Sequence, residues 1–92
     1  MRVRWTAPAA SDLTHICDYT ERHFGPAQAC RTALAIYNSA DSLRKLPLKG
    51  RQGRRAGTRE LSIPKSPFLV IYRIRERVIE VIRVLHGAQK WP

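Results

Sequence analysis

The sequence predicts an α+β domain in which a helical hairpin packs on one face of a small curved antiparallel β-sheet. Two observations predict it: helix-period apolar stripes run through the first half of the chain, and β-branched and aromatic segments run through the second half. Strands grouped after helices are typical of α+β proteins, so we expect the order β-α-α-β-β-β. A chain of 92 residues forms one domain, over residues 1–92, with a small core.

The first half predicts an edge strand at residues 3–5 and two helices. Thr6 is an N-cap for the first helix, Pro8 suits its first turn, and Gly25-Pro26 ends it. The second helix runs from about Pro26 to Leu46, and the short connection makes the pair an antiparallel hairpin. The stripe positions are Leu13, Ile16, Cys17, Thr20 and Phe24 in the first helix and Ala33, Ile36, Tyr37, Ala40 and Leu43 in the second.

The second half predicts strands over residues 58–63, 68–75 and 78–86, with a hairpin turn at Glu76-Arg77. That turn places Ile74 opposite Ile79, Tyr72 opposite Val81 and Val70 opposite Arg83. The face expected to meet the helices carries Phe68, Val70, Tyr72, Ile74, Ile79, Val81, Arg83 and Leu85. The face expected to meet solvent or a partner carries Leu69, Ile71, Arg73, Arg75, Val78, Glu80, Ile82, Val84 and His86.

The net charge of +10 lies entirely in the second half of the chain. Residues 1–43 carry four basic and four acidic side chains, whereas residues 44–92 carry thirteen basic and three acidic ones. This asymmetry predicts a surface for a polyanion or an acidic partner. The clearest cluster is the basic loop, with Lys45, Lys49, Arg51, Arg54, Arg55 and Arg59, which contains no acidic residue and could neutralise several phosphates.

Four other residues have both a structural and a functional interpretation. Arg73 faces Glu80, either as a simple cross-strand ion pair or as a ligand contact. Arg83 either lays its stem along the core or pairs with Asp12 or Asp18. His86 ends the last strand on the open face, where it either bonds to backbone or transfers a proton. Trp91 could stack on a base, pack on the sheet or anchor a partner.

Several classes of function are excluded or disfavoured. Cys17 and Cys30 lie in different helices, near the apolar stripes where they would be buried, and no CxxC or HxxxH spacing predicts a metal site. The chain shows no P-loop and no Gly-x-Ser-x-Gly, and we expect no cofactor and no small-molecule substrate. No apolar run could cross a membrane and no signal peptide is evident, so the cytoplasm is the expected location.

Four segments give the chain a resemblance to the RelE/ParE superfamily of toxins from type II toxin–antitoxin modules. They are residues 3–13 (VRWTAPAASDL), 57–61 (GTREL), 68–74 (FLVIYRI) and 81–91 (VIRVLHGAQKW), and the resemblance covers essentially all 92 residues. It implies the same β-α-α-β-β-β fold and a growth-inhibiting protein that a cognate antitoxin neutralises in a hetero-oligomeric complex. ParE-like members poison DNA gyrase and are not enzymes; RelE-like members cleave mRNA in the ribosome without a metal ion.

The sequence departs from the nuclease pattern and so favours the ParE-like side. Nuclease members carry an arginine three residues before the tyrosine of the middle strand, where this chain has Leu69. The loss of a cation removes electrostatic stabilisation of a pentacovalent phosphate. If the chain were RelE-like instead, Arg59, Arg83 and His86 would be its catalytic residues. A third alternative is a non-toxic basic module that binds nucleic acid.

The residues expected to bind a target, whether gyrase or a nucleic acid such as ribosomal RNA or mRNA, are Lys49, Arg51, Arg54, Arg55, Lys65, Arg73 and Trp91. The antitoxin is expected on the same surface, where the basic loop lies beside the open face of the sheet.

Overall fold

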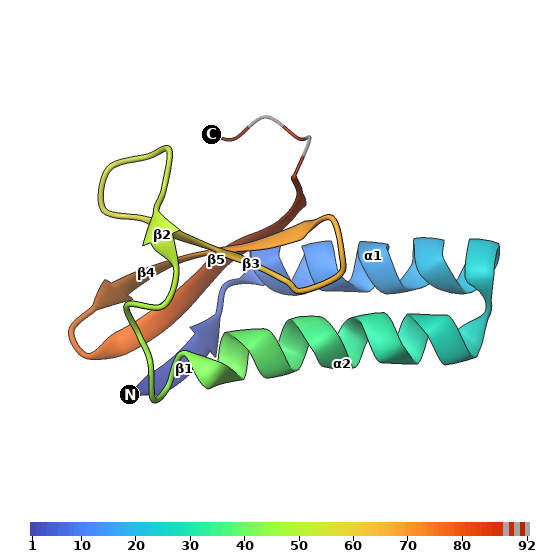
Figure 1. The fold of residues 1–92 in the computed structure, drawn as a ribbon, viewed down its shortest axis with the longest axis horizontal. Helices are drawn as coiled ribbons and strands as arrows, with labels where there is room; N and C mark the ends of the chain where they lie inside the picture. The colour runs from blue at the N-terminus through green and yellow to red at the C-terminus, as the bar shows by residue number, and fades with distance from the viewer. Residues whose placement is uncertain (88, 90, 92) are drawn as a thin grey trace.

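The computed structural model contains two helices and a five-stranded sheet (Figure 1). It describes residues 1–87, Gln89 and Trp91; Ala88, Lys90 and Pro92 lie outside the described residues. In chain order the elements are β1 (Arg2–Trp5), α1 (Ala7–Phe24), α2 (Pro26–Ser42), β2 (Arg51–Gln52), β3 (Arg59–Ser62), β4 (Phe68–Arg75) and β5 (Val78–His86).

The strands lie in the order β1-β5-β4-β3-β2, and the helical hairpin covers one face of the sheet. This arrangement confirms the α+β class and the predicted order of the main elements. The sheet is mixed, because β1 pairs parallel to β5 while all the other neighbours are antiparallel. No helix of the described residues covers the other face of the sheet, which we call the open face.

The ends of the helices follow local chemistry. The Thr6 hydroxyl accepts a hydrogen bond from the Ala9 N–H at 3.2 Å, and Gly25 has a φ of 89°, which ends α1 and lets α2 begin. Helix α2 ends at Ser42, earlier than the predicted Leu46, and the chain continues in turns to the short strand β2, which the sequence did not predict. No helix in the described part of the chain is long and apolar enough to cross a membrane.

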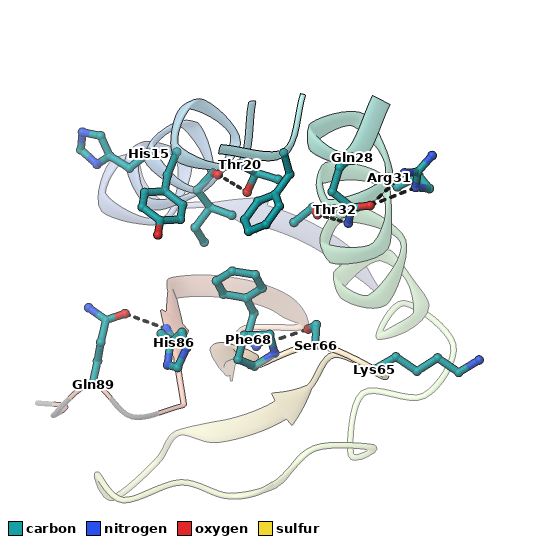
Figure 2. A pocket seen from close by; sticks show the side chains of 14 residues that line it. His15, Thr20, Gln28, Arg31, Thr32, Lys65, Ser66, Phe68, His86 and Gln89 are labelled. Atoms are coloured by element: carbon teal, nitrogen blue, oxygen red, sulfur yellow. Dashed lines mark hydrogen bonds between the residues drawn. The ribbon is translucent and has the colours of Figure 1, made fainter. Parts of the chain in front are cut away.

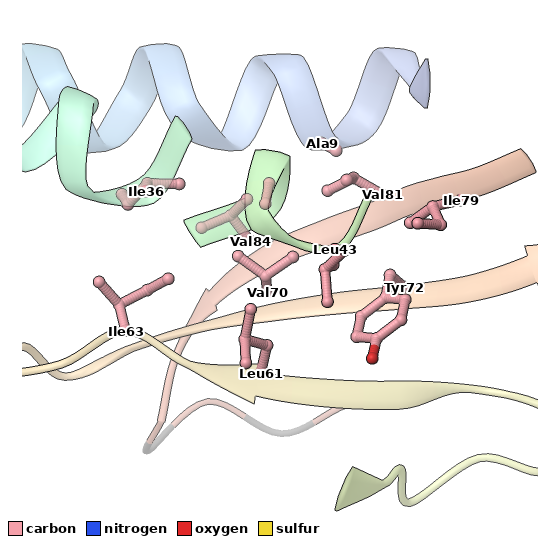
Figure 3. Packing of buried hydrophobic residues seen from close by; sticks show 11 residues of the cluster. Ala9, Ile36, Leu43, Leu61, Ile63, Val70, Tyr72, Ile79, Val81 and Val84 are labelled. Atoms are coloured by element: carbon pink, nitrogen blue, oxygen red, sulfur yellow. The ribbon is translucent and has the colours of Figure 1, made fainter. Parts of the chain in front are cut away.

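The core lies between the helices and the sheet (Figure 3). Ile36 from α2 and Leu43, the residue that caps the end of α2, meet Val70 and Tyr72 from β4, and all four are completely buried. Two residues that the helical stripes placed in the core, Phe24 and Tyr37, are instead exposed. Cys30 is also exposed rather than buried.

A β-bulge in the β4–β5 hairpin changes the register from the predicted one. Glu76 and Arg77 both have positive φ, which suits the predicted two-residue turn, and Ile74 and Tyr72 pair with Ile79 and Val81 as expected. The pairing then shifts by one residue between Ile71 and Tyr72.

The shift corrects the predicted faces of the end of β5. Val70 pairs with Val84, not with Arg83, and Val84 joins the main core. Leu85 packs with Leu69 and Ile71 in a second cluster instead of facing the helices. His86 was expected on the open face, but it lines a groove on the helix side. An extra residue in one strand exchanges the two faces beyond it, because side chains alternate with period two.

Candidate functional site

The open face carries two buried glutamates, and each of them holds arginines in place. Glu60 on β3 is 3% exposed, and its carboxylate accepts a hydrogen bond from Arg51 Nη2 at 3.2 Å and one from the Arg54 backbone N–H at 3.0 Å. The Arg54 Nε atom lies 3.4 Å from the same carboxylate. Glu60 therefore anchors the basic loop to the sheet.

The ionisation of Glu60 depends on these contacts. Burial alone would raise its pKa, but the Arg54 N–H, the Arg51 hydrogen bond and the charges of both arginines outweigh burial, so the pKa of Glu60 is lowered. The carboxylate is thus charged at neutral pH and balances part of the positive charge of the loop.

Glu80 on β5 has the same role at the other end of the open face. It is 4% exposed, it accepts a hydrogen bond from Arg73 Nε on β4 at 2.6 Å, and it forms an ion pair with Arg4 on β1. The Arg73–Glu80 pair confirms the predicted cross-strand ion pair. The Arg4 contact was not predicted, because it depends on the parallel pairing of β1 with β5.

The second apolar cluster, of Leu69, Ile71 and Leu85, begins beside Glu60 and extends along the strands away from Glu80, and Trp91 packs against it. The Arg55 guanidinium lies 6.0 Å from the Trp91 ring centroid, and Arg54 Nη1 donates to the Gln89 carbonyl at 3.2 Å. The described part of the tail is therefore held by the basic loop. Of the predicted target-binding residues, Arg51, Arg54, Arg55, Arg73 and Trp91 gather on or beside the open face.

The other two predicted target-binding residues lie elsewhere. Lys49 is exposed in the segment before β2, and Lys65 is exposed in the turn between β3 and β4. Lys65 contributes to the groove on the helix side, not to the open face.

This groove separates the far end of the helical hairpin from the ends of the strands (Figure 2). Its volume is about 870 Å³, and its lining includes the aromatic side chains of Tyr19 and Phe24 from α1 and of Phe68 from β4. His86 contacts Phe68 edge to face, with ring centroids 6.0 Å apart. A groove with exposed aromatic side chains is suited to receive an apolar segment of another chain.

The three candidate catalytic residues are placed in different surroundings. Arg59 donates to the Gly50 carbonyl at 2.7 Å and so supports the loop before β2. Arg83 forms a bidentate pair with Asp12 of α1, at 2.7 and 2.9 Å, which confirms one of the two predicted partners. The hydrogen bond and charge of Asp12 raise the pKa of Arg83. His86 is three residues beyond Arg83, so the strand alternation directs the two side chains to opposite faces.

The sequence singled out neither Arg2, Arg4 and Arg75 on the open face nor Tyr19 in the groove as functional candidates. No sequence pattern indicated the groove, because the helical stripe placed Phe24 in the core, whereas the structure exposes it. Within the described residues, no group of three or more His, Cys, Asp or Glu side chains is placed to hold a metal ion.

The comparisons with known proteins decide the family. Residues 3–91 match the family described as the ParE toxin of the type II toxin–antitoxin system parDE. The chain belongs to the ParE toxin family. It is also 38% identical over 91 residues to the inferred toxin Y4kP of Sinorhizobium fredii, covering 99% of this chain and 93% of the relative. The chain is 36% identical over 88 residues to the toxin RelE2 of Caulobacter vibrioides, covering 96% of this chain and 97% of that relative.

Solved structures of the ParE toxin family and its relatives have the same fold as this chain. A chain of the chromosomal ParDE system of P. aeruginosa superposes with a TM-score of 0.88 at 27% identity, covering 94% of this chain and 95% of that one. A chain of the RelBE2 toxin–antitoxin complex of Mycobacterium tuberculosis superposes with a TM-score of 0.68 at 25% identity, covering 92% of this chain and 95% of that one. The protein is therefore a type II toxin of the RelE/ParE superfamily, as its resemblance implied.

Proposed function

We propose that this ParE-family toxin inhibits growth by binding DNA gyrase and is not itself a nuclease. The observation that carries the proposal is the state of the candidate catalytic residues. Arg83 is engaged by Asp12, Arg59 supports a loop, and His86 faces the groove. A nuclease needs cations and a proton-transferring group around one phosphate, and this chain has Leu69 where nuclease relatives carry an arginine.

A ribosome-dependent mRNA endonuclease is the second candidate, because one relative is named RelE2 and one structural neighbour is a RelBE2 complex. In that case Arg59, Arg83 and His86 would hold phosphate and transfer protons. Binding of RNA to the ribosome-bound toxin would then have to rearrange the Asp12–Arg83 pair.

Pulse labelling after induced expression separates the two candidates. Under the gyrase proposal, DNA synthesis stops first and cleavage complexes of gyrase with DNA accumulate. An early stop of protein synthesis with mRNA cuts in the ribosomal A site would overturn the proposal and favour the endonuclease. Normal growth on induction of the folded chain would favour a non-toxic module.

His86→Ala tests the same proposal at one residue. We expect the variant to remain fully toxic, since a gyrase inhibitor needs no proton transfer. Growth after induction is the measurement, and a thermal melt confirms that the variant is folded. Loss of toxicity in a folded His86→Ala protein would contradict the proposal.

We further propose that the cognate antitoxin inserts an apolar segment into the groove between the helical hairpin and the strand ends. Phe24 is 69% exposed and Tyr19 is 54% exposed, and both line this groove. Aromatic side chains with this exposure are typical anchors of protein–protein contacts. The groove, and not the surface beside the open face where the sequence predicted the antitoxin, would then take the antitoxin and leave the open face to the target.

A further inference from the structure

We propose that four arginines of the open face, Arg2, Arg4, Arg73 and Arg75, form a binding site for the phosphodiester backbone of duplex DNA. We call them the arginine quartet. The site goes beyond gyrase as the target, because it assigns to the toxin a direct contact with nucleic acid.

The strand register brings the quartet together. Glu80 on β5 has Arg4 of β1 on one side and Arg73 of β4 on the other. In the next row, Val78 of β5 lies in the same way between Arg2 and Arg75. Residues two apart on a strand share a face, so all four arginines project from the face that carries Glu80. The quartet spans about 6.7 Å along the strands and about 9.6 Å across them, from standard strand spacings.

The charges of the quartet are only partly balanced. Glu80 pairs with Arg4 and Arg73. Three of the arginines, Arg2, Arg4 and Arg75, line a shallow depression of about 360 Å³ together with Glu80 and the exposed Glu76 of the turn, and Arg73 lies next to it, beside Glu80. Four arginines thus face two carboxylates. Because Glu80 is buried, it fixes two of the guanidinium groups before any ligand arrives, which lowers the entropic cost of binding. A planar guanidinium presents paired N–H donors that match phosphate oxygens.

The lining of the depression favours duplex DNA over the other polyanions. It contains one apolar side chain, Val78, and no aromatic one. Single-stranded nucleic acid is bound largely by stacking its bases on aromatic rings, and amphipathic protein segments need an apolar groove. A cluster of arginines without aromatic neighbours instead contacts phosphates without reading bases, which is how proteins bind duplex DNA irrespective of its sequence.

The test is the binding of the purified full-length toxin to a fluorescent 20-base-pair DNA duplex, measured by anisotropy from 50 to 200 mM salt. Arg75→Glu and its matched control Arg22→Glu change the net charge equally, and both side chains are exposed. We expect Arg75→Glu to weaken binding on the order of tenfold at 50 mM salt, and Arg22→Glu to change it little. Arg2→Gln/Arg75→Gln should reduce the slope of log affinity against log salt by about 1.8.

Arg2, Arg22 and Arg75 take no part in the ion pairs of Glu80, so all three variants should keep the wild-type melting temperature. Equal effects of Arg75→Glu and Arg22→Glu would overturn the proposal, because binding would then follow net charge alone. Dependence on Arg75 seen only with single-stranded RNA, or only with the antitoxin, would also overturn it. Gyrase is absent from this assay, so its outcome is independent of the pulse-labelling result.

Discussion

Glu60 and Glu80 show how a strongly basic protein keeps its arginines in fixed positions. Each carboxylate is buried in the open face and binds arginines from neighbouring strands or from the basic loop. Removing one partner of a buried ion pair costs more than the pair contributes, because the remaining charge is left without a partner in a poorly solvated site. These glutamates are therefore needed for folding as well as for placing charge.

The lowered pKa of Glu60 predicts a pH dependence of stability. A lowered pKa in the folded state stabilises the protein above the ordinary carboxyl range, and this stability is lost as the pH falls through the folded pKa. Glu60→Gln removes this contribution, so its free energy of unfolding should fall less steeply than that of the wild type as the pH is lowered from about 5 to about 3. Urea unfolding at several pH values measures it, with Glu21→Gln as an exposed control. Parallel curves for Glu60→Gln and the wild type would contradict the prediction.

The hydroxyl group of Tyr72 is expected to stabilise the fold, so its removal should lower the free energy of unfolding. Its hydroxyl donates to the Pro47 carbonyl at 2.8 Å and accepts from the buried Gly50 N–H at 2.9 Å. Tyr72→Phe leaves both backbone groups without this partner, so we expect a loss of about 1–3 kcal/mol in the free energy of unfolding. Chemical denaturation measures the loss. Tyr37→Phe, at an exposed tyrosine, should cost much less, and a similar cost for both would count against this role of Tyr72.

At the level of residues, contacts between neighbouring strands could be predicted and contacts through loops could not. The pairing of Arg73 with Glu80 follows from the period of two and a two-residue turn. The partners of Tyr72 lie in a loop whose path depends on the whole fold, so the sequence indicated a core tyrosine but not its role in fixing the loop.

At the level of elements, Asp12 connects α1 to the part of β5 that extends beyond β1. The pairing of β1 with β5 ends at Trp5 and Val81, and the Asp12 carboxylate then accepts the Val84 N–H at 2.9 Å. The same carboxylate holds Arg83. Asp12 therefore provides the partner that a further residue of β1 would have provided, and it caps an otherwise open strand edge.

Asp12→Ala should consequently destabilise the protein by about 2 kcal/mol, because it leaves a backbone N–H and a half-buried guanidinium without their acceptor. Asp12→Asn should cost less, since its amide oxygen can still accept one of these hydrogen bonds. Thermal or chemical unfolding measures both changes. Asp18→Ala, at an exposed position on the same helix, is the control, and an equal loss there would contradict the role of Asp12.

The elements themselves were largely predictable, since strong patterns mark both helices and the β4–β5 hairpin. The bulge, the short strand β2 and the parallel pairing of β1 were not. Each depends on where a strand ends relative to a distant neighbour, and no local sequence pattern reports that. The bulge has the largest effect on the site, because it moves His86 from the open face to the groove.

At the level of the whole molecule, the groove and the arginine quartet have separate linings, so the two proposed partners would bind at different places. Phe24→Ser tests the groove. Phe24 is 69% exposed, so the substitution should leave the melting temperature almost unchanged while weakening binding of the cognate antitoxin roughly tenfold. Calorimetric titration with the purified antitoxin measures the affinity. Unchanged affinity would show that the antitoxin binds elsewhere, and Leu34→Ser, at an exposed α2 position outside the groove lining, is the control.

The pairing of β1 with β5 has a consequence for the timing of synthesis. β1 precedes the other strands along the chain, and β5, its partner strand in the described part of the sheet, is the last of these strands to be translated. Until β5 emerges, Arg2 and Arg4 have no strand to pair beside, and α1 lacks the strand on which it packs. A nascent toxin chain thus carries neither the assembled arginine quartet nor the completed groove. The folded surfaces of the toxin therefore form only after β5 has been translated.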